Sequence, residues 1–238
     1  MEYNNIKKGI FKSRPNRFIA ICDVDEKEEV CHVKNTGRCR ELLCENAVVY
    51  LEESGNPKRK TKYDLIAVEK GEKLFNIDSQ APNKVVFEWL DRGGLFDDVT
   101  LIKPECKYKN SRFDFYVEHG GKGAYIEVKG VTLEEDGVLL FPDAPTQRGT
   151  KHINELIKAI DDGFEAYVLF VVQTDEAKYF TPNKKTDSAF YCSLENAQKK
   201  GVKILCYSCK AQPDSLKIKD EVPVIMQGSD GREIYEKK

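Results

Sequence analysis

Two acidic residues and one lysine are spaced so that they could form a metal site. Asp114 lies in the strand-like run 111–117, and Glu127 and Lys129 lie in a second such run, 124–129. Alternate side chains of a strand point to the same face, so Glu127 and Lys129 should lie on one face of their strand. Pairing of the two strands would then bring Asp114 beside Glu127. Three apolar residues of the first run are expected on the face opposite to Asp114: Phe113, Phe115 and Val117.

This arrangement is suited to binding a hard divalent cation. Two neighbouring carboxylates repel each other, and each resists ionisation unless a cation joins them. Mg²⁺ takes oxygen ligands, retains several waters and accepts phosphate oxygens. A bound metal lowers the pKa of its water and polarises the phosphate, and Lys129 would orient the water or offset charge on the phosphate. The alternative interpretation is an exposed strand face that carries a Lys–Glu pair.

A sheet with helices on its faces is predicted to position these residues. Asn83 is a candidate helix cap, and Gly163 stands where a later helix should end. A nearly continuous apolar run favours one strand buried on both faces. The αβββαβ order, followed by αβ, predicts a central sheet covered by helices. The expected elements are a helix over 84–91, strands near 100–107, 112–117 and 124–129, a helix over 150–162, a strand over 165–172, a helix near 188–200 and a strand near 202–208.

The first third of the chain has a different pattern. Short β-rich runs alternate with polar or glycine-containing turns, which predicts an OB-like five-stranded β-barrel. The expected strands are 17–24, 28–33, 47–53, 63–69 and 72–78. The chain is therefore expected to have two domains of α+β and α/β character. The predicted boundaries are 1–82 for the barrel, 83–210 for the sheet domain and 211–238 for a C-terminal extension.

The composition limits where a nucleic acid could bind. The net charge is −2, so any such surface must be a local patch. The N-terminus lacks an apolar targeting segment, and the longest apolar run, 166–172, is too short to cross a bilayer. A cytoplasmic protein without a membrane partner is expected. Its eight cysteines should be free thiols, and Cys206 and Cys209 are interpreted as small buried hydrophobes rather than metal ligands.

Several basic residues are candidates for phosphate contacts. Four of them lie within five residues beside Tyr63, in a predicted turn of the barrel. Basic and aromatic residues can act together in binding a nucleic acid there. A solvated turn is the alternative interpretation. Two more precede or open the 150–162 helix, whose N-terminus is suited to an anion. The nucleic-acid-binding candidates are Lys58, Arg59, Lys60 and Lys62, extended by Arg14 and Arg17, together with Arg148 and Lys151.

Two further polar residues stay ambiguous at this point. His152 borders the apolar stripe of its helix, so it is a proton shuttle or a half-buried structural histidine. Gln173 ends the buried strand and could position either a water or the strand itself. The glycine-rich turn at 120–123 lacks a phosphate-loop pattern and predicts a hairpin turn.

Asp114 with Glu127-Val-Lys129 in an αβββαβ setting resembles the PD-(D/E)XK nuclease superfamily. The whole chain more specifically resembles the sugar fermentation stimulation protein A family. Ordered stretches between about residues 10 and 210 carry that resemblance: Asn35-Thr-Gly-Arg, Asn56-Pro-Lys-Arg-Lys, Ser111-Arg-Phe-Asp-Phe, Glu127-Val-Lys-Gly-Val-Thr-Leu, Phe141-Pro-Asp-Ala-Pro-Thr, Arg148-Gly-Thr-Lys-His and Phe170-Val-Val-Gln. It implies an OB-like domain followed by a restriction-endonuclease-like αβββαβ domain with a central mixed sheet.

The resemblance also implies roles for particular residues. Asp114 and Glu127 would be metal ligands, the Val128 carbonyl would complete the site, and Lys129 would be the catalytic lysine. Glu88 matches the acidic residue that many of these nucleases add, although a solvent-facing glutamate is the alternative. The implied cofactor is Mg²⁺, with Mn²⁺ as a substitute. The implied partner is DNA bound without strong sequence preference, with RNA as an alternative.

Three functional classes are compatible with these patterns to different degrees. A metal-dependent nuclease that hydrolyses phosphodiester bonds accounts for Asp114, Glu127 and Lys129 together. A non-catalytic DNA-binding regulator linked to sugar metabolism would keep the fold without an evident need for all three. A hydrolase of another kind ranks third, because neither G-x-S-x-G nor H-E-x-x-H occurs and the three histidines are scattered. Nothing in the sequence indicates the oligomeric state.

Overall fold

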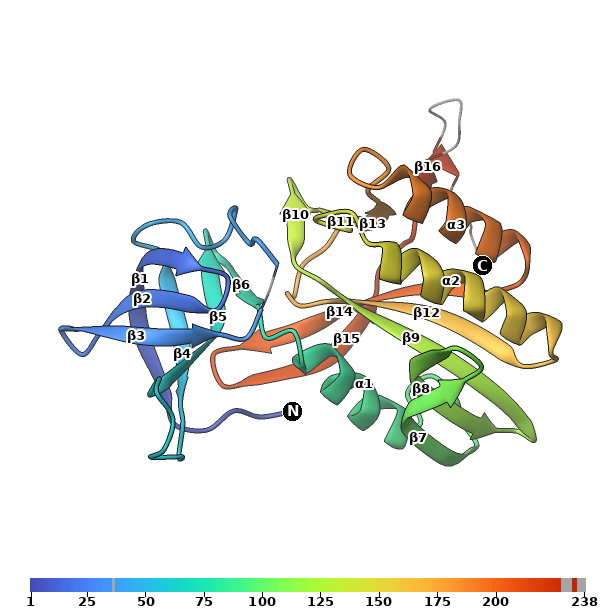
Figure 1. Ribbon diagram of the computed structural model, residues 1–238, viewed down its shortest axis with the longest axis horizontal. Helices are drawn as coiled ribbons and strands as arrows, with labels where there is room; N and C mark the ends of the chain where they lie inside the picture. Colours follow the sequence, from blue (N-terminus) through green and yellow to red (C-terminus); the bar gives the residue numbers. More distant parts are fainter. Residues whose placement is uncertain (36, 228–232, 235–238) are drawn as a thin grey trace.

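The computed structural model describes residues 1–35, 37–227 and 233–234. An N-terminal barrel lies beside a larger domain in which helices cover both faces of a mixed sheet (Figure 1). This arrangement confirms the predicted fold class.

Five strands close the barrel. The six-stranded sheet has the order β3-β2-β1-β4-β5-β6, and a parallel pairing of β3 with β5 closes its first five strands into a ring. The core contains the alternate residues of β2, Ala20, Cys22 and Val24, as the two-residue period of a strand requires. The strands are β1 (Ile6–Asn16), β2 (Ile19–Val24), β3 (Lys27–Val33), β4 (Val48–Glu53), β5 (Tyr63–Lys70) and β6 (Lys73–Asn76).

The count of five barrel strands is confirmed, but one member differs from the prediction. The sequence did not indicate β1, whereas the strand expected at 72–78 is β6, which only extends the sheet beyond β5. Two of the inward residues of β1 are Gly9 and Phe11. A Cβ on Gly9 would stand 2.8 Å from the Asp23 carbonyl oxygen, so close packing requires a glycine here. The glycine and the register shifts after Phe11 and Ser13 weaken the alternation that reveals strands.

The second domain has a six-stranded sheet in the order β15-β14-β12-β9-β8-β7. β12 pairs in parallel with both β9 and β14, and the other pairings are antiparallel. The main elements are α1 (Ala81–Asp91), β7 (Val99–Tyr108), β8 (Ser111–His119), β9 (Lys122–Val131), α2 (Gln147–Asp161), β12 (Glu165–Val172), α3 (Ser188–Lys199), β14 (Lys203–Gln212) and β15 (Ser215–Glu221).

Both faces of strand β12 are buried, which explains why its sequence is almost entirely apolar. Tyr167, Leu169 and Val171 pack in the cluster that contains α1. The alternate residues of the same strand, including Val168 and Phe170, pack in the cluster that contains α2 and α3. Because helices cover both faces, neither set of side chains faces water.

Two helices begin earlier than expected. α1 starts at Ala81 with Pro82 in its first turn, so Asn83 lies inside the helix and the prediction that it caps the helix is wrong. Thr146 caps α2, and its Oγ1 accepts a hydrogen bond from the Gly149 amide at 3.0 Å. Gly163 has a φ of 90° just after α2, as a helix-ending glycine should.

The sequence suggested that the segment beyond residue 210 is a late extension. The structure shows that this prediction is wrong. β14 continues to Gln212, and β15 forms the edge of the main sheet. Leu216 is fully buried, and its amide donates to the Met1 carbonyl at 3.1 Å. The sequence also did not indicate two small pairings, the sheet of β10 (Leu133–Glu135), β11 (Val138–Phe141) and β13 (Tyr179–Pro182) and the pair β16 (Met226–Gln227) with β17 (Glu233–Ile234).

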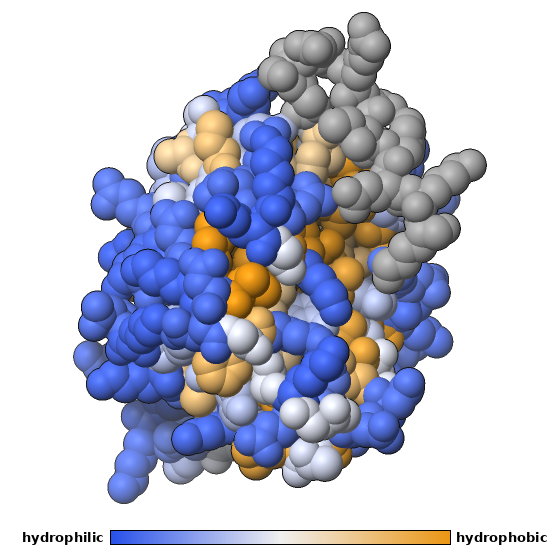
Figure 2. Space-filling model, turned by 90° about the vertical axis from the view of Figure 1, so that its right-hand side faces the viewer, coloured by the Kyte–Doolittle hydropathy of each residue, from blue (hydrophilic) through white to orange (hydrophobic). Residues whose placement is uncertain are grey.

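The side of the larger domain that faces away from the barrel is mainly hydrophilic, with small apolar areas between charged side chains (Figure 2). All eight cysteines are free, and Cys206 and Cys209 are buried, as predicted. Among the described residues, no helix is long and apolar enough to cross a membrane.

Candidate active site

Strands β8 and β9 separate at the point where the two acidic residues lie. Their backbone pairing ends at Phe115 and Ile126, one position before Asp114 and Glu127 would face each other. The Asp114 carboxylate continues the contact, because its Oδ2 accepts a hydrogen bond from the Val128 amide at 2.7 Å. A carboxylate therefore lies inside the fork of the two strands.

Asn83 fixes the other oxygen of Asp114. Its Nδ2 donates to Asp114 Oδ1 at 2.8 Å, and Asn83 lies in the first turn of α1. The pattern along the sequence predicted instead that Asn83 caps its own helix. No local pattern distinguishes an asparagine that caps its own helix from one that reaches across to a strand.

The two oxygens of the Glu127 carboxylate differ in their hydrogen-bond partners. Oε1 accepts from Lys129 Nζ and from His152 Nδ1, both at 2.5 Å. Oε2 is buried and has no hydrogen-bond partner among the described residues. His152 Nδ1 faces an acceptor, so this nitrogen carries the proton. His152 thus lies in the site as a neighbour of Glu127.

The electrostatics of the two carboxyls differ. Burial and the charge of Glu127 raise the pKa of Asp114. Burial also acts to raise the pKa of Glu127, but the hydrogen bond from His152 and the charge of Lys129 outweigh it and lower that pKa. The opposing shifts arise because Glu127 contacts the cationic Lys129 directly, whereas Asp114, among the described residues, accepts hydrogen bonds only from neutral amides. Of the two carboxyls, Glu127 is therefore the one whose ionised form is more strongly stabilised.

The donor set fits a hard divalent cation bound mainly by water and phosphate. The unpartnered, buried Oε2 of Glu127 is an oxygen whose burial is costly without a positive partner. Among the described residues, no group of three or more His, Cys, Asp or Glu side chains could hold a metal ion. Mg²⁺ is typically bound by one or two carboxylates and completes its sphere with water and phosphate oxygens. Asp114 and Glu127 match that requirement.

The faces of β8 differ from the prediction at one residue. Phe115 and Val117 pack in the cluster that contains α1, but Phe113 packs in the cluster that contains α2. The alternation breaks at Asp114, where β8 leaves β9. On the other side of β8, Glu105 of β7 has a φ of 54° between the paired residues Pro104 and Cys106. The fork that opens the site is thus a local departure from regular sheet geometry.

Glu88 does not join these carboxylates. Its Oε2 forms a salt bridge with the N-terminal ammonium of Met1 at 2.7 Å. That ammonium also donates to the Leu216 carbonyl at 2.9 Å, so Glu88 helps to hold the chain start against β15. The catalytic role predicted for Glu88 stays a prediction, and the contact that the structure gives its carboxylate is the ion pair with Met1.

Two of the predicted phosphate-binding arginines have structural partners. Arg14 donates to four carbonyl oxygens, those of Arg17, Asn35, Gly37 and Arg38, at 2.6–2.9 Å. Arg59 forms two hydrogen bonds to the buried Asp64 carboxylate, at 2.6 and 2.8 Å. Tyr63 is also buried, so it offers no ring for stacking. These residues build the barrel rather than a free basic surface.

The other predicted basic residues remain exposed. Lys58 and Lys60 project from the β4–β5 loop, and Lys62 pairs with Glu53 at 3.3 Å. Arg17 lies over the exposed ring of Phe18 at 4.8 Å. At the start of α2, Arg148 is exposed, and Lys151 donates to the Asn110 carbonyl at 3.0 Å.

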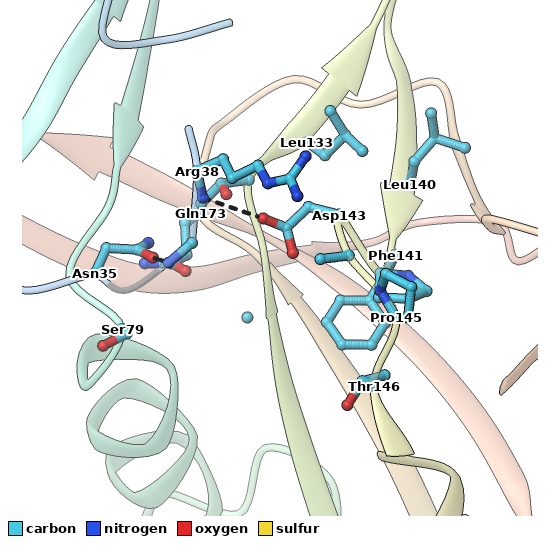
Figure 3. A pocket seen from close by; sticks show the side chains of 15 residues that line it. Asn35, Arg38, Ser79, Leu133, Leu140, Phe141, Asp143, Pro145, Thr146 and Gln173 are labelled. Carbon is cyan, nitrogen blue, oxygen red and sulfur yellow. Dashed lines mark hydrogen bonds between the residues drawn. The ribbon is translucent and has the colours of Figure 1, made fainter. Parts of the chain in front are cut away.

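A pocket of about 440 Å³ opens between the two domains (Figure 3). Gly130, the residue after Lys129, lies in its wall. The barrel domain contributes the 35–38 loop, and the sheet domain contributes the segment 140–146 that leads into α2. The sequence did not predict this pocket, because its walls come from segments about a hundred residues apart.

Comparison with known proteins gives matches along nearly the whole chain. The family model described as the SfsA N-terminal OB domain matches residues 13–77, and the one described as the sugar fermentation stimulation protein RE domain matches residues 80–215. A sugar fermentation stimulation protein homolog of Clostridium beijerinckii is 57% identical over 226 residues, which cover 95% of this chain and 100% of the relative. A homolog of Ruminiclostridium cellulolyticum is 54% identical and covers 94% and 99%.

A solved structure is similar over the same extent. It is that of Pyrococcus furiosus SfsA in complex with Ca²⁺, with a TM-score of 0.85 and 28% sequence identity. The match covers 94% of this chain and 97% of the other. Both domains are therefore shared with that protein.

Proposed function

The chain belongs to the sugar fermentation stimulation protein family, and on this premise we propose that it is a metal-dependent nuclease. In this proposal it binds DNA without strong sequence preference and hydrolyses phosphodiester bonds with Mg²⁺, or with Mn²⁺ in its place. RNA is the alternative substrate.

One observation carries the proposal. The fork between β8 and β9 gathers Asp114, Glu127 and Lys129, and within the part of the chain that the structure describes the buried Oε2 of Glu127 has no hydrogen-bond partner. A structural salt bridge between Lys129 and Glu127 would not require a second carboxylate whose pKa is raised by burial and by the charge of Glu127. A divalent cation would satisfy both carboxylates at once.

The residues that would hold the cation are Asp114 and Glu127, with the Val128 carbonyl as a further ligand. When bound, a divalent cation polarises a phosphate oxygen and lowers the pKa of a water ligand. Lys129 is 17% exposed at its side chain, so its ammonium is fixed by Glu127 and still reaches solvent. In the proposed reaction it would offset negative charge on the phosphate oxygens. Asn83 holds the Asp114 carboxylate, and His152 holds that of Glu127.

The Ca²⁺ complex of the Pyrococcus furiosus relative supports the choice of a hard cation. Ca²⁺ and Mg²⁺ both prefer oxygen ligands, although Mg²⁺ is smaller and keeps more of its waters. The OB domain supports a nucleic-acid substrate, because the loops and strands of this fold commonly bind oligonucleotides.

Substitution of Lys129 tests the proposal most directly. We expect Lys129→Ala to fold normally, to bind DNA only modestly less well and to lose cleavage almost completely, because transition-state stabilisation affects rate more than binding. Asp114→Asn should also abolish Mg²⁺-dependent cleavage, and the loss of one negative charge should tighten DNA binding. The matched control is Lys107→Ala, which removes an exposed lysine of β7 and should cleave normally.

The assay measures gel-shift affinity and product formation on single- and double-stranded DNA and RNA, with Mg²⁺, with Mn²⁺ and with a chelator. The chelator should stop cleavage by the unmodified protein. Cleavage that survives both Lys129→Ala and Asp114→Asn would place the activity elsewhere. A protein that binds DNA but cuts no substrate with either metal would be a DNA-binding regulator instead of a nuclease.

A further inference from the structure

The pocket between the domains shares several elements with the carboxylate fork. Gly130 in its wall directly follows Lys129. Thr146, also in the wall, caps the helix that carries His152. Ser79 lies just before the helix that carries Asn83. The pocket and the fork are therefore built from neighbouring parts of the same three elements, although Asp114, Glu127 and Lys129 do not themselves line the pocket.

The lining of the pocket is mixed in the way that small-molecule sites are. Such sites have volumes of roughly 300–1,000 Å³, apolar walls and a few placed polar groups. Figure 3 shows Phe141 and Pro145 close together on one side and the Asp143 carboxylate near Arg38 on another. The apolar part of the lining consists of Leu133, Leu140, Phe141, Pro142, Ala144 and Pro145.

Gln173 presents an oriented acceptor to this space. Its Nε2 donates to Asn76 Oδ1 and to the Asp78 carbonyl, both at 2.9 Å, which fixes the direction of the amide. Oε1 then lies beside Gly130, where a Cβ would stand only 2.7 Å from it. The glycine leaves that oxygen accessible from the pocket side. The barrel and β12 thus cooperate to hold one acceptor in place.

The barrel wall is also held close to the sheet domain. A Cβ on Gly37 would stand 2.9 Å from Asn35 Oδ1 and 3.1 Å from Asp143 Oδ2. The Arg38 amide donates to the same Asp143 oxygen at 3.4 Å. The exposed Arg38 side chain lies at the rim, where a cation suits a phosphate.

We propose that this pocket holds one unpaired nucleotide of the substrate strand, next to the phosphate that is cut. This inference rests on the proposed nuclease function and narrows its substrate to single strands or to duplexes with unpaired ends. A nucleoside is the group that follows a phosphate along the strand. Its base would lie against the rings of Phe141 and Pro145 and donate an N–H to Gln173 Oε1 or Asp143. A paired base already uses that edge, so it must leave the duplex before it can enter.

The test uses single-stranded oligonucleotides in which 2-aminopurine replaces one base at successive positions. Binding is measured with a chelator present, so cleavage plays no part. We expect a fluorescence change at one position and a preference of about tenfold or more for the single strand over a blunt duplex, since one base contact is worth about 1–3 kcal/mol. Ala144→Trp should fill the pocket, remove the position-specific change and weaken single-strand binding about tenfold.

The matched control is Ala189→Trp, which adds the same ring at an exposed position of α3 and should bind like the unmodified protein. Thermal unfolding of both variants shows whether each is folded. If the unmodified protein binds DNA with equal signals at all positions and no preference for single strands, the pocket assignment is wrong, whereas the proposed nuclease function stands. Absence of both DNA binding and cleavage would overturn the nuclease proposal itself.

Discussion

Glu127 and Asp114 are fixed by different kinds of neighbour. Asp114 accepts from a backbone amide and a neutral side-chain amide, Val128 and Asn83. Glu127 accepts from Lys129 and His152 through one oxygen only. Two donors on Oε1 turn Oε2 away from both of them. We therefore interpret His152 as a positioning residue that keeps Oε2 available for a cation.

Substitution of His152 should weaken metal binding. Partners that orient metal ligands typically contribute 10–100-fold to affinity, so His152→Ala should lower Mn²⁺ affinity by about tenfold or more. His152→Asn can still donate to Glu127 and should restore most of the loss. Electron paramagnetic resonance of free Mn²⁺ measures both affinities without any cleavage step.

Thermal unfolding separates this effect from loss of packing, because His152 is almost completely buried. An alanine variant that is less stable yet binds Mn²⁺ with unchanged affinity would show that His152 serves the core alone. Equal losses of affinity in the alanine and asparagine variants would also exclude the donor role.

Sequence reasoning found the residues of the fork but not their supports. Asp114, Glu127 and Lys129 follow from strand periodicity, which is a local property. His152 stayed ambiguous because it borders the apolar stripe of α2, where structural and functional histidines have the same spacing. Arg14 and Arg59 looked like free cations because the carbonyls and the carboxylate that bind them are a matter of tertiary contact.

At the scale of elements, Asp64 joins β5 to its neighbours. This buried carboxylate accepts from Arg59 in the β4–β5 loop and contacts His32 Nδ1 at 2.9 Å across the β3–β5 pairing. Lys34 lies 3.4 Å away. The parallel β3–β5 contact closes the barrel, so these charges stabilise the closure.

Asp64 should therefore make stability depend on pH. Burial opposes its ionisation, but the hydrogen bonds from Arg59 and His32 and the charge of Lys34 lower its pKa to about 2. A pKa below the unfolded value of about 3.9 contributes about 2 kcal/mol. That contribution is complete above pH 4 and disappears as the pH falls towards 2.

Urea unfolding of Asp64→Asn should show this loss at pH 7, and the difference from the unmodified protein should shrink below pH 4. Asp25→Asn removes an exposed carboxylate that pairs with Lys7, so it should change stability little. A constant difference for Asp64→Asn between pH 7 and pH 2.5 would mean that packing, not charge, is what the substitution removes.

A helix or strand could be predicted from the sequence where a single hydrophobic pattern runs along its whole length. β12 is covered on both faces and α2 has a broad apolar stripe, so both appear clearly in the sequence. β1 did not, because a required glycine and two register shifts interrupt its alternation. β15 lies in a polar tail, and only its pairing with β14 and the contact of Leu216 with Met1 make it part of the sheet.

At the scale of the whole molecule, hydrogen bonds and ion pairs join the two domains. The side chain of Asn76, at the end of the barrel, donates to Tyr3 and accepts from Gln173. Its backbone amide donates to the carbonyl of the same glutamine. Lys70 of β5 donates to the Glu134 carboxylate of β10 at 2.7 Å. The fork and the pocket thus lie between surfaces held at a fixed separation, which suits one strand of nucleic acid better than an adaptable partner.

Each domain carries a separate group of exposed cations. Lys58 and Lys60 project from the barrel, and Arg148 and Lys151 lie at the start of α2 in the sheet domain. The net charge of −2 gives no general attraction for nucleic acid, so binding must depend on such local groups. Because Arg14 and Arg59 are bound internally, the number of phosphates contacted should be small.

The salt dependence of single-strand binding can show which group is used. Log affinity against log salt has a slope of about −0.7 for each phosphate neutralised. Lys58→Ala with Lys60→Ala, and Arg148→Ala with Lys151→Ala, should each reduce the magnitude of the slope by about 1.4 if the strand crosses both domains. The control pair, Lys210→Ala with Lys217→Ala, removes two exposed lysines that face each other on β14 and β15.

Measured with a chelator present, the control pair should keep the slope of the unmodified protein. A change only in the Arg148 and Lys151 variant would confine the strand to the sheet domain, and the barrel would then act by shaping the pocket wall. A change only in the Lys58 and Lys60 variant would direct the strand away from the fork, and the carboxylates could not act on a phosphate of the bound strand. The two-domain path requires both slopes to fall, because each basic group would then contact phosphates of the same strand.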